Sequence, residues 1–275
     1  MIKILITAFD AFGGDAINAA QETVREVSVP AEDIELIRLE LPTVFGRSAE
    51  LLTQAMQTHR PDAVICVGQA SGRAAVTVER VAVNIMDARI PDNAGCQPVD
   101  EPVDADGPAA YFSTLPIKQI AAAIHACGVE AEISNTAGTY VCNQLMYSGL
   151  HYAAVHDPQM QVGFIHVPNL AGAGGEAGAG QTAMDREKIV LALETAIEVT
   201  AENVRQNIRQ QAEVIKEADI DALVAMLDHY TGEEGSRMKI DVVEGEGKVI
   251  SRQYHHGRCD VGSPWAKGQA FDVLE

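Results

Sequence analysis

Hydrophobic positions along the chain follow two alternating patterns. Short apolar runs of strand length occupy residues 2–8, 34–41, 63–67, 76–85, 129–134 and 161–167. Between them, apolar residues recur every three or four positions, which predicts helices at residues 15–27, 44–59, 116–127, 141–155 and 185–217. Strands that alternate with helices form βαβ crossovers, so the pattern predicts an α/β fold with a mostly parallel sheet between layers of helices.

Two stretches depart from this alternation. Residues 86–108 are rich in Asp, Pro and Asn, which predicts a long loop. The composition changes after Gln211, and residues 237–244 and 248–254, joined by Gly245-Glu246-Gly247, predict a β-hairpin. We therefore expect a main domain at residues 1–211 and a C-terminal extension at 212–275, which contains a helix, the hairpin and a tail of unknown fold.

The composition of the chain limits the partners and the cellular location that can be expected. The chain has 275 residues and a formal net charge of −19, which argues against binding to nucleic acid or to an anionic membrane. It contains no run of eighteen apolar residues, so no membrane-spanning helix is expected. The apolar N-terminus meets Asp10 at once and is typical of a strand rather than a signal peptide. Five cysteines without paired spacing favour a reducing compartment, and a cytoplasmic location is expected.

Candidate chemistry gathers where the predicted strands end. In open parallel sheets, sites form at the carboxyl ends of the strands, so the loops after Phe9, Val67, Ser134 and Val167 should share one rim. Cys142 falls in the first turn of the helix that follows Ser134. Free backbone N–H groups and the helix dipole favour a thiolate there, lower the thiol pKa and offer an oxyanion hole. A buried structural cysteine is the alternative.

A nucleophilic cysteine needs an imidazole that shares its proton and a third group that orients the imidazole. His166 ends a predicted strand in the unit directly after Cys142 and is the candidate acid–base. Glu79 is a candidate orienting group, with Asp87 and Asp92 as competitors. Alternatively, His166 is structural, and Glu79 forms a solvated pair with its neighbour Arg80.

Four blocks carry a resemblance to a known family. They are TAFDAFGGDAIN (7–18), GQASGRAAVTVERVAVN (68–84), ISNTAGTYVCNQLMY (133–147) and GFIHVP (163–168). In these blocks the chain resembles pyroglutamyl peptidase type I, also called pyrrolidone-carboxylate peptidase, a family of cysteine peptidases. The resemblance implies Cys142 as nucleophile, His166 as acid–base and Glu79 as orienting carboxylate. It also implies an open, twisted three-layer α/β/α sandwich over roughly the first three-quarters of the chain, and a homo-oligomer, either a dimer or a tetramer.

The implied substrates are peptides with an N-terminal pyroglutamate, a compact uncharged lactam. Such a ring needs a mostly apolar pocket with a few hydrogen-bonding groups. We expect Phe9 and Phe12 to close over the ring and Val141 to line the floor. The resemblance adds Asn18 and Gln69 as nearby polar groups and Arg89 as a residue near the active site. The alternative for Phe9 and Phe12 is packing in the core, and the alternative for Arg89 is an ion pair on the surface. No metal or cofactor is expected.

Other interpretations stay open at this point. Gly172–Ala177 satisfies the dinucleotide-binding pattern, although Pro168, Asn169 and Leu170 intervene after the strand; a flap at residues 170–180 is the preferred interpretation. His255, His256, Cys259 and Asp260 offer metal-binding atoms, but real zinc sites seldom draw four ligands from six residues. Two further hypotheses are a non-catalytic binding or assembly protein on the same fold, and an amidase or nucleoside-processing enzyme on a similar scaffold.

Overall fold

A computed structural model describes residues 1–14, 16–29, 31–172, 182–217, 237–244, 248–255 and 258–259, and their side chains as far as residue 210. The chain divides into two compact units, Met1–Val204 and Arg205–Glu275.

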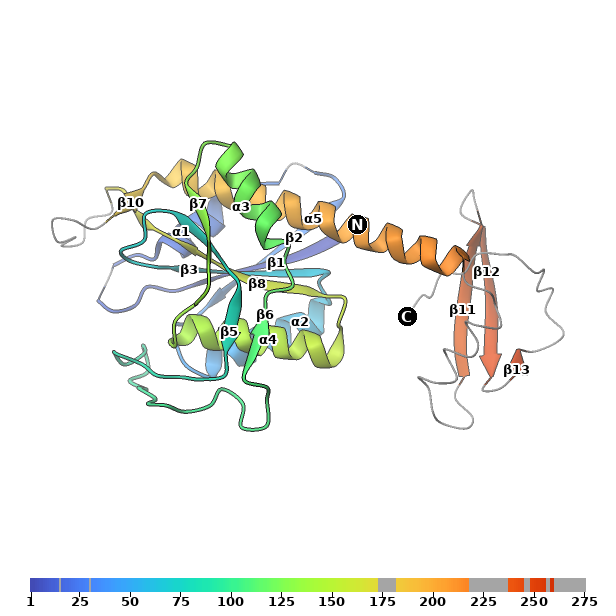
Figure 1. Cartoon of the computed structure of the whole chain (residues 1–275), viewed down its shortest axis with the longest axis horizontal. Coiled ribbons are helices and arrows are strands. Elements are labelled where there is room, and N and C mark those ends of the chain that lie inside the picture. The colour runs from blue at the N-terminus through green and yellow to red at the C-terminus, as the bar shows by residue number, and fades with distance from the viewer. Residues whose placement is uncertain are drawn as a thin grey trace. The chain divides into compact units, whose positions relative to one another are not determined.

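The first unit is built on a six-stranded sheet in the order β2-β1-β3-β8-β4-β7 (Figure 1). Its strands are β1 (Ile2–Phe9), β2 (Ile34–Leu41), β3 (Ala63–Gln69), β4 (Val76–Glu79), β7 (Ala131–Ser134) and β8 (Gln161–Val167). Neighbouring strands are parallel except β4 and β8, which are antiparallel. Two-stranded sheets form from β5 (Val81–Val83) with β6 (Ala110–Phe112), and from β9 (Asn169–Leu170) with β10 (Ala183–Met184).

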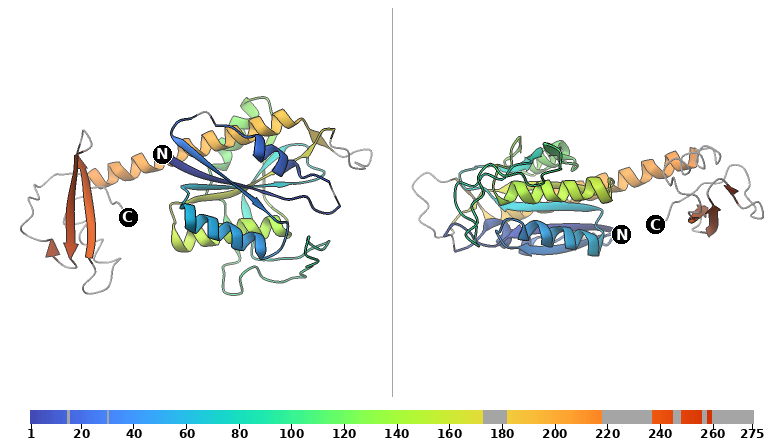
Figure 2. Two further views of the ribbon diagram at one scale, coloured as in Figure 1. Left: turned by 180° about the vertical axis from the view of Figure 1, so that it is seen from behind. Right: turned by 90° about the horizontal axis from the view of Figure 1, so that it is seen from below.

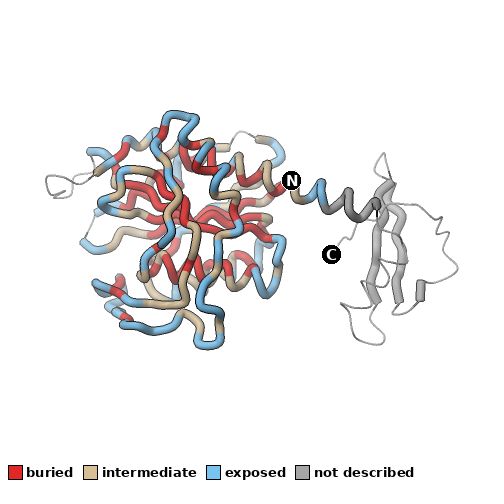
Figure 3. The backbone as a smooth tube through the Cα atoms, in the orientation of Figure 1, coloured by how far each residue is buried: buried red, intermediate tan, exposed pale blue. Residues whose placement is uncertain are grey.

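Helices cover both faces of this sheet, as the α/β sandwich prediction requires. One apolar cluster joins the sheet to α1 (Ala19–Glu26), α3 (Ile117–Ala126) and the first part of α5 (Arg186–Glu217). A second cluster joins the opposite face to α2 (Arg47–His59) and α4 (Val141–His156), which lie side by side (Figure 2). Figure 3 shows the buried backbone concentrated in the strands between these layers. Strand alternation sorts the side chains between the two clusters.

Three local predictions need correction. The first helix begins at Ala19 instead of near Asp15, because the Asn18 side chain accepts a hydrogen bond from the Ala20 N–H and caps the helix. The β segment at 76–85 is broken at Arg80 into β4 and β5, which pair with different strands. The strand before Cys142 is an edge strand that runs opposite to β8, so its carboxyl end does not point with those of β1, β3 and β8.

The second unit contains a three-stranded antiparallel sheet. Its strands are β11 (Arg237–Glu244), β12 (Lys248–His255) and β13 (Arg258–Cys259). Glu244 pairs with Lys248, which confirms the predicted hairpin. Within the described ranges, no helix is both long and apolar enough to cross a membrane.

Candidate active site

His166 lies near the end of β8 on the face that α2 and α4 cover. Val162 and Phe164 belong to the apolar cluster on that face, whereas Ile165 and Val167 belong to the other cluster. Because side chains alternate along a strand, His166 shares the face of Phe164, and the two rings lie 4.6 Å apart. His166 is only 4% exposed, so its imidazole is held by packing as well as by hydrogen bonds.

Cys142 reaches the same place from the second position of α4. Gly68 of β3 pairs in the sheet with His166 of β8. A Cβ atom placed on Gly68 would lie 3.2 Å from the Cys142 sulfur and 2.8 Å from Cζ of Phe164. The sulfur therefore lies against the β3 backbone at the level of His166, and the space at Gly68 admits no side chain.

Glu79 arrives from the strand on the other side of His166. Antiparallel pairing sets Thr77 of β4 opposite His166, and Glu79 lies two residues further along on the same face. Its Oε1 is 2.8 Å from Nδ1 of His166, and its side chain is fully buried. A carboxylate only accepts, so Nδ1 carries the hydrogen and Nε2 is left with its lone pair for a proton.

The competing carboxylates lie elsewhere. Asp92 accepts hydrogen bonds from the backbone N–H groups of Phe45, Ala94 and Cys96, and so it orders residues 92–96 of the long loop and joins them to Phe45. Asp87 is exposed. Glu79 is also not the solvated partner of Arg80, because Arg80 donates to Asn135 and Glu79 is buried.

Arg73 is a residue of this site that sequence reasoning missed. Its Nη1 lies 2.5 Å from Oε1 of Glu79 and also contacts the Thr77 hydroxyl, and its Nη2 donates to the Thr136 carbonyl at 3.2 Å. The available signal was an arginine six residues before the candidate glutamate, in the same sequence block. Only the tertiary structure shows that this cation meets the buried carboxylate.

The electrostatics favour a site that rests neutral at Cys142 and His166. Burial raises the pKa of the Cys142 thiol to about 12, aided by the charge of Glu79 and by the neighbouring Cys66 thiol and opposed by Arg73. Burial also lowers the pKa of His166, although Glu79 opposes this effect. The expectation of a lowered thiol pKa is therefore wrong for the resting site, because desolvation of the thiolate outweighs the helix N-terminus.

For Glu79, hydrogen bonds outweigh the effect of burial on the pKa. Burial by itself raises the pKa of this carboxyl, but hydrogen bonds from His166, Ser134 and Arg73 lower it, and the pKa ends below its usual value. A buried carboxylate stays ionised in this way when enough donors replace water.

The predicted apolar pocket residues differ in exposure. Phe9 and Val141 are 2% and 0% exposed and belong to the core, where Phe9 packs on Phe164. Phe12 is half-buried, with its ring 6.2 Å from that of Tyr140, two residues before Cys142. Tyr140 was not predicted; it also packs edge-on against Phe45 and donates to the Pro91 carbonyl. Phe12 and Tyr140 are thus both partly exposed and lie close to the start of α4.

The predicted polar pocket residues have structural contacts. Asn18 is 1% exposed; its Oδ1 caps α1 and its Nδ2 donates to the Asp10 carbonyl. Gln69, at the end of β3, accepts from the Ala19 N–H at 2.6 Å. Together they hold the loop after β1 against the end of β3. Arg89 is exposed on the long loop.

The remaining candidate sites lie apart from these residues or outside the described chain. A cavity of about 460 Å³ between α2, α4 and residues 103–105 contains none of the predicted site residues. Residues 173–181, which include most of the dinucleotide-like pattern and of the proposed flap, lie outside the described residues. The same holds for His256 and Asp260, and for the side chains of His255 and Cys259, so the metal hypothesis stays a prediction. In the described part of the chain, no group of three His, Cys, Asp or Glu side chains is placed to hold a metal.

Comparison with known proteins identifies the family to which this chain belongs. The sequence model of the family described as pyroglutamyl peptidase matches residues 2–203. A pyrrolidone-carboxylate peptidase of Streptococcus pyogenes serotype M4 (strain MGAS10750) is 54% identical over 167 residues, which are 61% of this chain and 78% of that protein.

Solved structures agree with the sequence comparison. The crystal structure of Bacillus amyloliquefaciens pyroglutamyl peptidase I superimposes with a TM-score of 0.70 at 42% identity, covering 74% of this chain and 98% of that one. A mutant pyrrolidone carboxyl peptidase from the hyperthermophile Pyrococcus furiosus gives a TM-score of 0.70 at 41% identity, over 74% and 99% of the two chains. The chain therefore belongs to the pyroglutamyl peptidase family of cysteine-type hydrolases.

Proposed function

We propose that this protein removes N-terminal pyroglutamate from peptides, with Cys142, His166 and Glu79 as its catalytic triad. One observation carries the assignment: the buried 2.8 Å hydrogen bond between Glu79 and Nδ1 of His166, at the sheet position where the Cys142 sulfur lies. The names of the relatives supply the substrate class.

The first step is attack of Cys142 on the pyroglutamyl carbonyl carbon. Because both Cys142 and His166 are neutral at rest, Nε2 of His166 takes the thiol proton as the carbon–sulfur bond forms. Glu79 keeps the hydrogen on Nδ1 and stabilises the imidazolium that results. Tyr140, the N-cap residue of α4, makes no capping hydrogen bond with its side chain, so the first N–H groups of the helix, including that of Cys142, are suited to stabilise the oxyanion.

The second step releases the peptide. His166 donates its proton to the departing amine, and a thioester between pyroglutamate and Cys142 remains. Water activated by the neutral His166 then hydrolyses the thioester and regenerates the thiol. Apart from this water molecule, the groups that act in these steps are side chains and backbone N–H groups of this chain.

For the lactam ring, Phe12 and Tyr140 are the preferred contacts, since both are partly exposed beside α4. Phe9 and Val141 support the pocket from the core, and Asn18 and Gln69 hold its first loop in place. Arg89 is exposed and is suited to the peptide beyond the ring. The cytoplasmic location and the dimer or tetramer stay predictions.

The test is release of aminomethylcoumarin from pyroglutamyl-aminomethylcoumarin. We expect activity in the wild type, loss of activity in Cys142→Ala, and little activity in Cys142→Ser. Cys96→Ala is the matched control, because Cys96 is also a free cysteine but is exposed on the long loop. Iodoacetamide should inactivate the wild type and Cys96→Ala alike. An active Cys142→Ala protein would exclude the assignment, and a folded, reduced but inactive wild type would favour a non-catalytic protein on this fold.

We also propose that residues 1–211 form the catalytic domain and 212–275 an accessory extension. The family match ends at residue 203, and the first compact unit ends at Val204. Truncation after Gln211 should retain pyroglutamyl hydrolysis. Loss of activity in a truncated protein that stays folded would make the extension part of the active enzyme.

A further inference from the structure

Arg73 joins three parts of the candidate active site. From the loop between β3 and β4, its guanidinium reaches Glu79 and Thr77 on β4 and the carbonyl of Thr136 on the loop that leads to α4. Its side chain is 29% exposed, whereas that of Glu79 is 0% exposed. Arg73 is therefore a partly shielded cation on a fully buried carboxylate.

A buried carboxylate requires donors in place of water. Oxygen Oε1 of Glu79 accepts from both Nδ1 of His166 and Nη1 of Arg73. Without Arg73, the negative charge of Glu79 would act on His166 unopposed. The pKa of His166 would then rise, so a larger fraction of the imidazole would already be protonated and unable to accept the thiol proton.

The contact of Arg73 with Thr136 lies on the loop that leads to Cys142. Thr136 lies six residues before Cys142, and its carbonyl accepts from Nη2 of Arg73. Arg80 holds the same loop from the other side, since its Nε donates to Oδ1 of Asn135 at 2.8 Å. Of the two arginines, however, Arg73 is the one that contacts both this loop and Glu79. A comparison of Arg73 with Arg80 therefore distinguishes the effect of supporting the loop from the effect of controlling the carboxylate.

We propose that Arg73 is a positioning residue of the catalytic site, which holds Glu79 in its ionised form behind His166 and fixes the loop before Cys142. The proposal rests on the proposed roles of Cys142, His166 and Glu79. The charged groups that act on His166 are Glu79 and Arg73, and the charged or titratable groups that act on Cys142 are Glu79, the Cys66 thiol and Arg73. Arg73 lowers the pKa of both His166 and Cys142, so its removal should raise both.

The experiment compares Arg73→Ala, Arg73→Lys and Arg80→Ala in the full chain. For Arg73→Ala we expect kcat to fall about tenfold to a hundredfold with a smaller change in KM, and the acid limb of kcat/KM to move to higher pH. Millimolar guanidinium chloride should restore part of the activity of Arg73→Ala. It should restore none to Glu79→Gln, which lacks the carboxylate. Arg73→Lys keeps the charge, so its acid limb should stay near that of the wild type while kcat is intermediate.

The control and a readout that needs no substrate complete the test. Arg80→Ala should lower stability without moving the pH profile. The pH dependence of Cys142 alkylation by iodoacetamide should move to higher pH in Arg73→Ala and stay unchanged in Arg80→Ala. A shift in alkylation in a protein that hydrolyses no pyroglutamyl substrate would uphold the role of Arg73 and overturn the proposed function. Unchanged kcat, pH profile and alkylation in Arg73→Ala would overturn the role of Arg73 alone, and so would equal effects in Arg80→Ala.

Discussion

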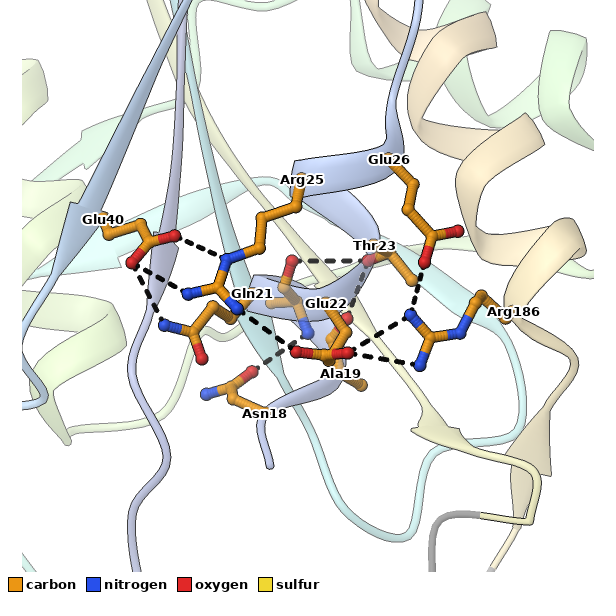
Figure 4. A network of polar contacts seen from close by, with 10 residues as sticks. Asn18, Ala19, Gln21, Glu22, Thr23, Arg25, Glu26, Glu40 and Arg186 are labelled. Atoms are coloured by element: carbon orange, nitrogen blue, oxygen red, sulfur yellow. Dashed lines mark hydrogen bonds and ion pairs between the residues drawn. The ribbon is translucent and has the colours of Figure 1, made fainter. Parts of the chain in front are cut away.

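The first unit contains two networks of charged side chains with similar distances and different surroundings. On α1, Arg25 lies 2.6 Å from Glu40 of β2, and both side chains are 52% exposed. In the same network, Arg186 at the start of α5 pairs with Glu22 and Glu26 (Figure 4). On the opposite face of the sheet, Arg73, Glu79 and His166 form a network whose carboxylate is fully buried.

The comparison shows that distance alone does not indicate the role of an ion pair. Water and salt screen the exposed network, so its pairs contribute little beyond joining α1 to its neighbours. In the buried network, each charge changes the protonation of the next group, because few water molecules compete. The same residue types therefore stabilise locally in one region and shift the pKa values of their neighbours in the other.

The largest expected effect comes from the buried carboxylate. Glu79→Gln keeps the size of the side chain but removes the charge that fixes the hydrogen on Nδ1 of His166. We expect kcat/KM to fall about a hundredfold to ten-thousandfold, the range of general acid–base contributions. Glu40→Gln, which removes a carboxylate from an equally short but exposed pair, is the matched control and should leave kcat/KM unchanged. Equal effects of the two substitutions would remove the distinction between the networks.

Packing around the buried network gives the second prediction. In Gly68→Ala, the new methyl group meets the Phe164 ring and the Cys142 sulfur. We expect a loss of about 1–3 kcal/mol in the free energy of unfolding, and a loss of about tenfold to a hundredfold in kcat as the sulfur moves. Gly149→Ala, whose new methyl group on α4 would lie 3.2 Å from the side chains of Leu52 and Val162, should change stability only. Full activity of Gly68→Ala would show that the sulfur tolerates displacement.

The pH dependence of the buried network is a smaller effect with a defined sign. Burial lowers the pKa of His166, so the neutral base persists to lower pH than an ordinary histidine, and the acid limb of kcat/KM should lie below about pH 6.5. Burial raises the pKa of Cys142 to about 12, so alkylation of the free enzyme should keep rising with pH above 9. An alkylation rate that reaches a plateau below pH 8 would indicate a preformed thiolate–imidazolium pair and contradict the neutral resting site.

The smallest effect is expected in the exposed network. Arg186→Gln removes the pairs with Glu22 and Glu26 at the start of α5. Unfolding in denaturant at low salt should show a loss of about 0.2–1 kcal/mol, which shrinks at high salt because the charges are screened. Activity should not change. A large loss that persists at high salt would mean that this network is less exposed than its side chains indicate.

Local sequence patterns predicted most of the strands and helices of the first unit and the principal site residues. Alternation along β4 and β8 and the helical spacing of α4 depend on neighbouring residues, so they are visible in the chain itself. The resemblance in four blocks then selected Cys142, His166 and Glu79, which the structure brings to one place. The predicted pocket was less clear, since Phe9 is a core residue and Asn18 a helix cap.

The sequence by itself determined the family, the α/β class and the identity of the candidate triad, because each is encoded in short contiguous blocks. Tertiary structure decided that β4 runs antiparallel to β8, that Arg73 reaches Glu79, and that burial raises the pKa of the Cys142 thiol. These properties depend on strand pairing and on the exclusion of water by residues distant in the chain. Side-chain alternation specifies which face a residue occupies, but not which strand lies beside it or how far water is excluded.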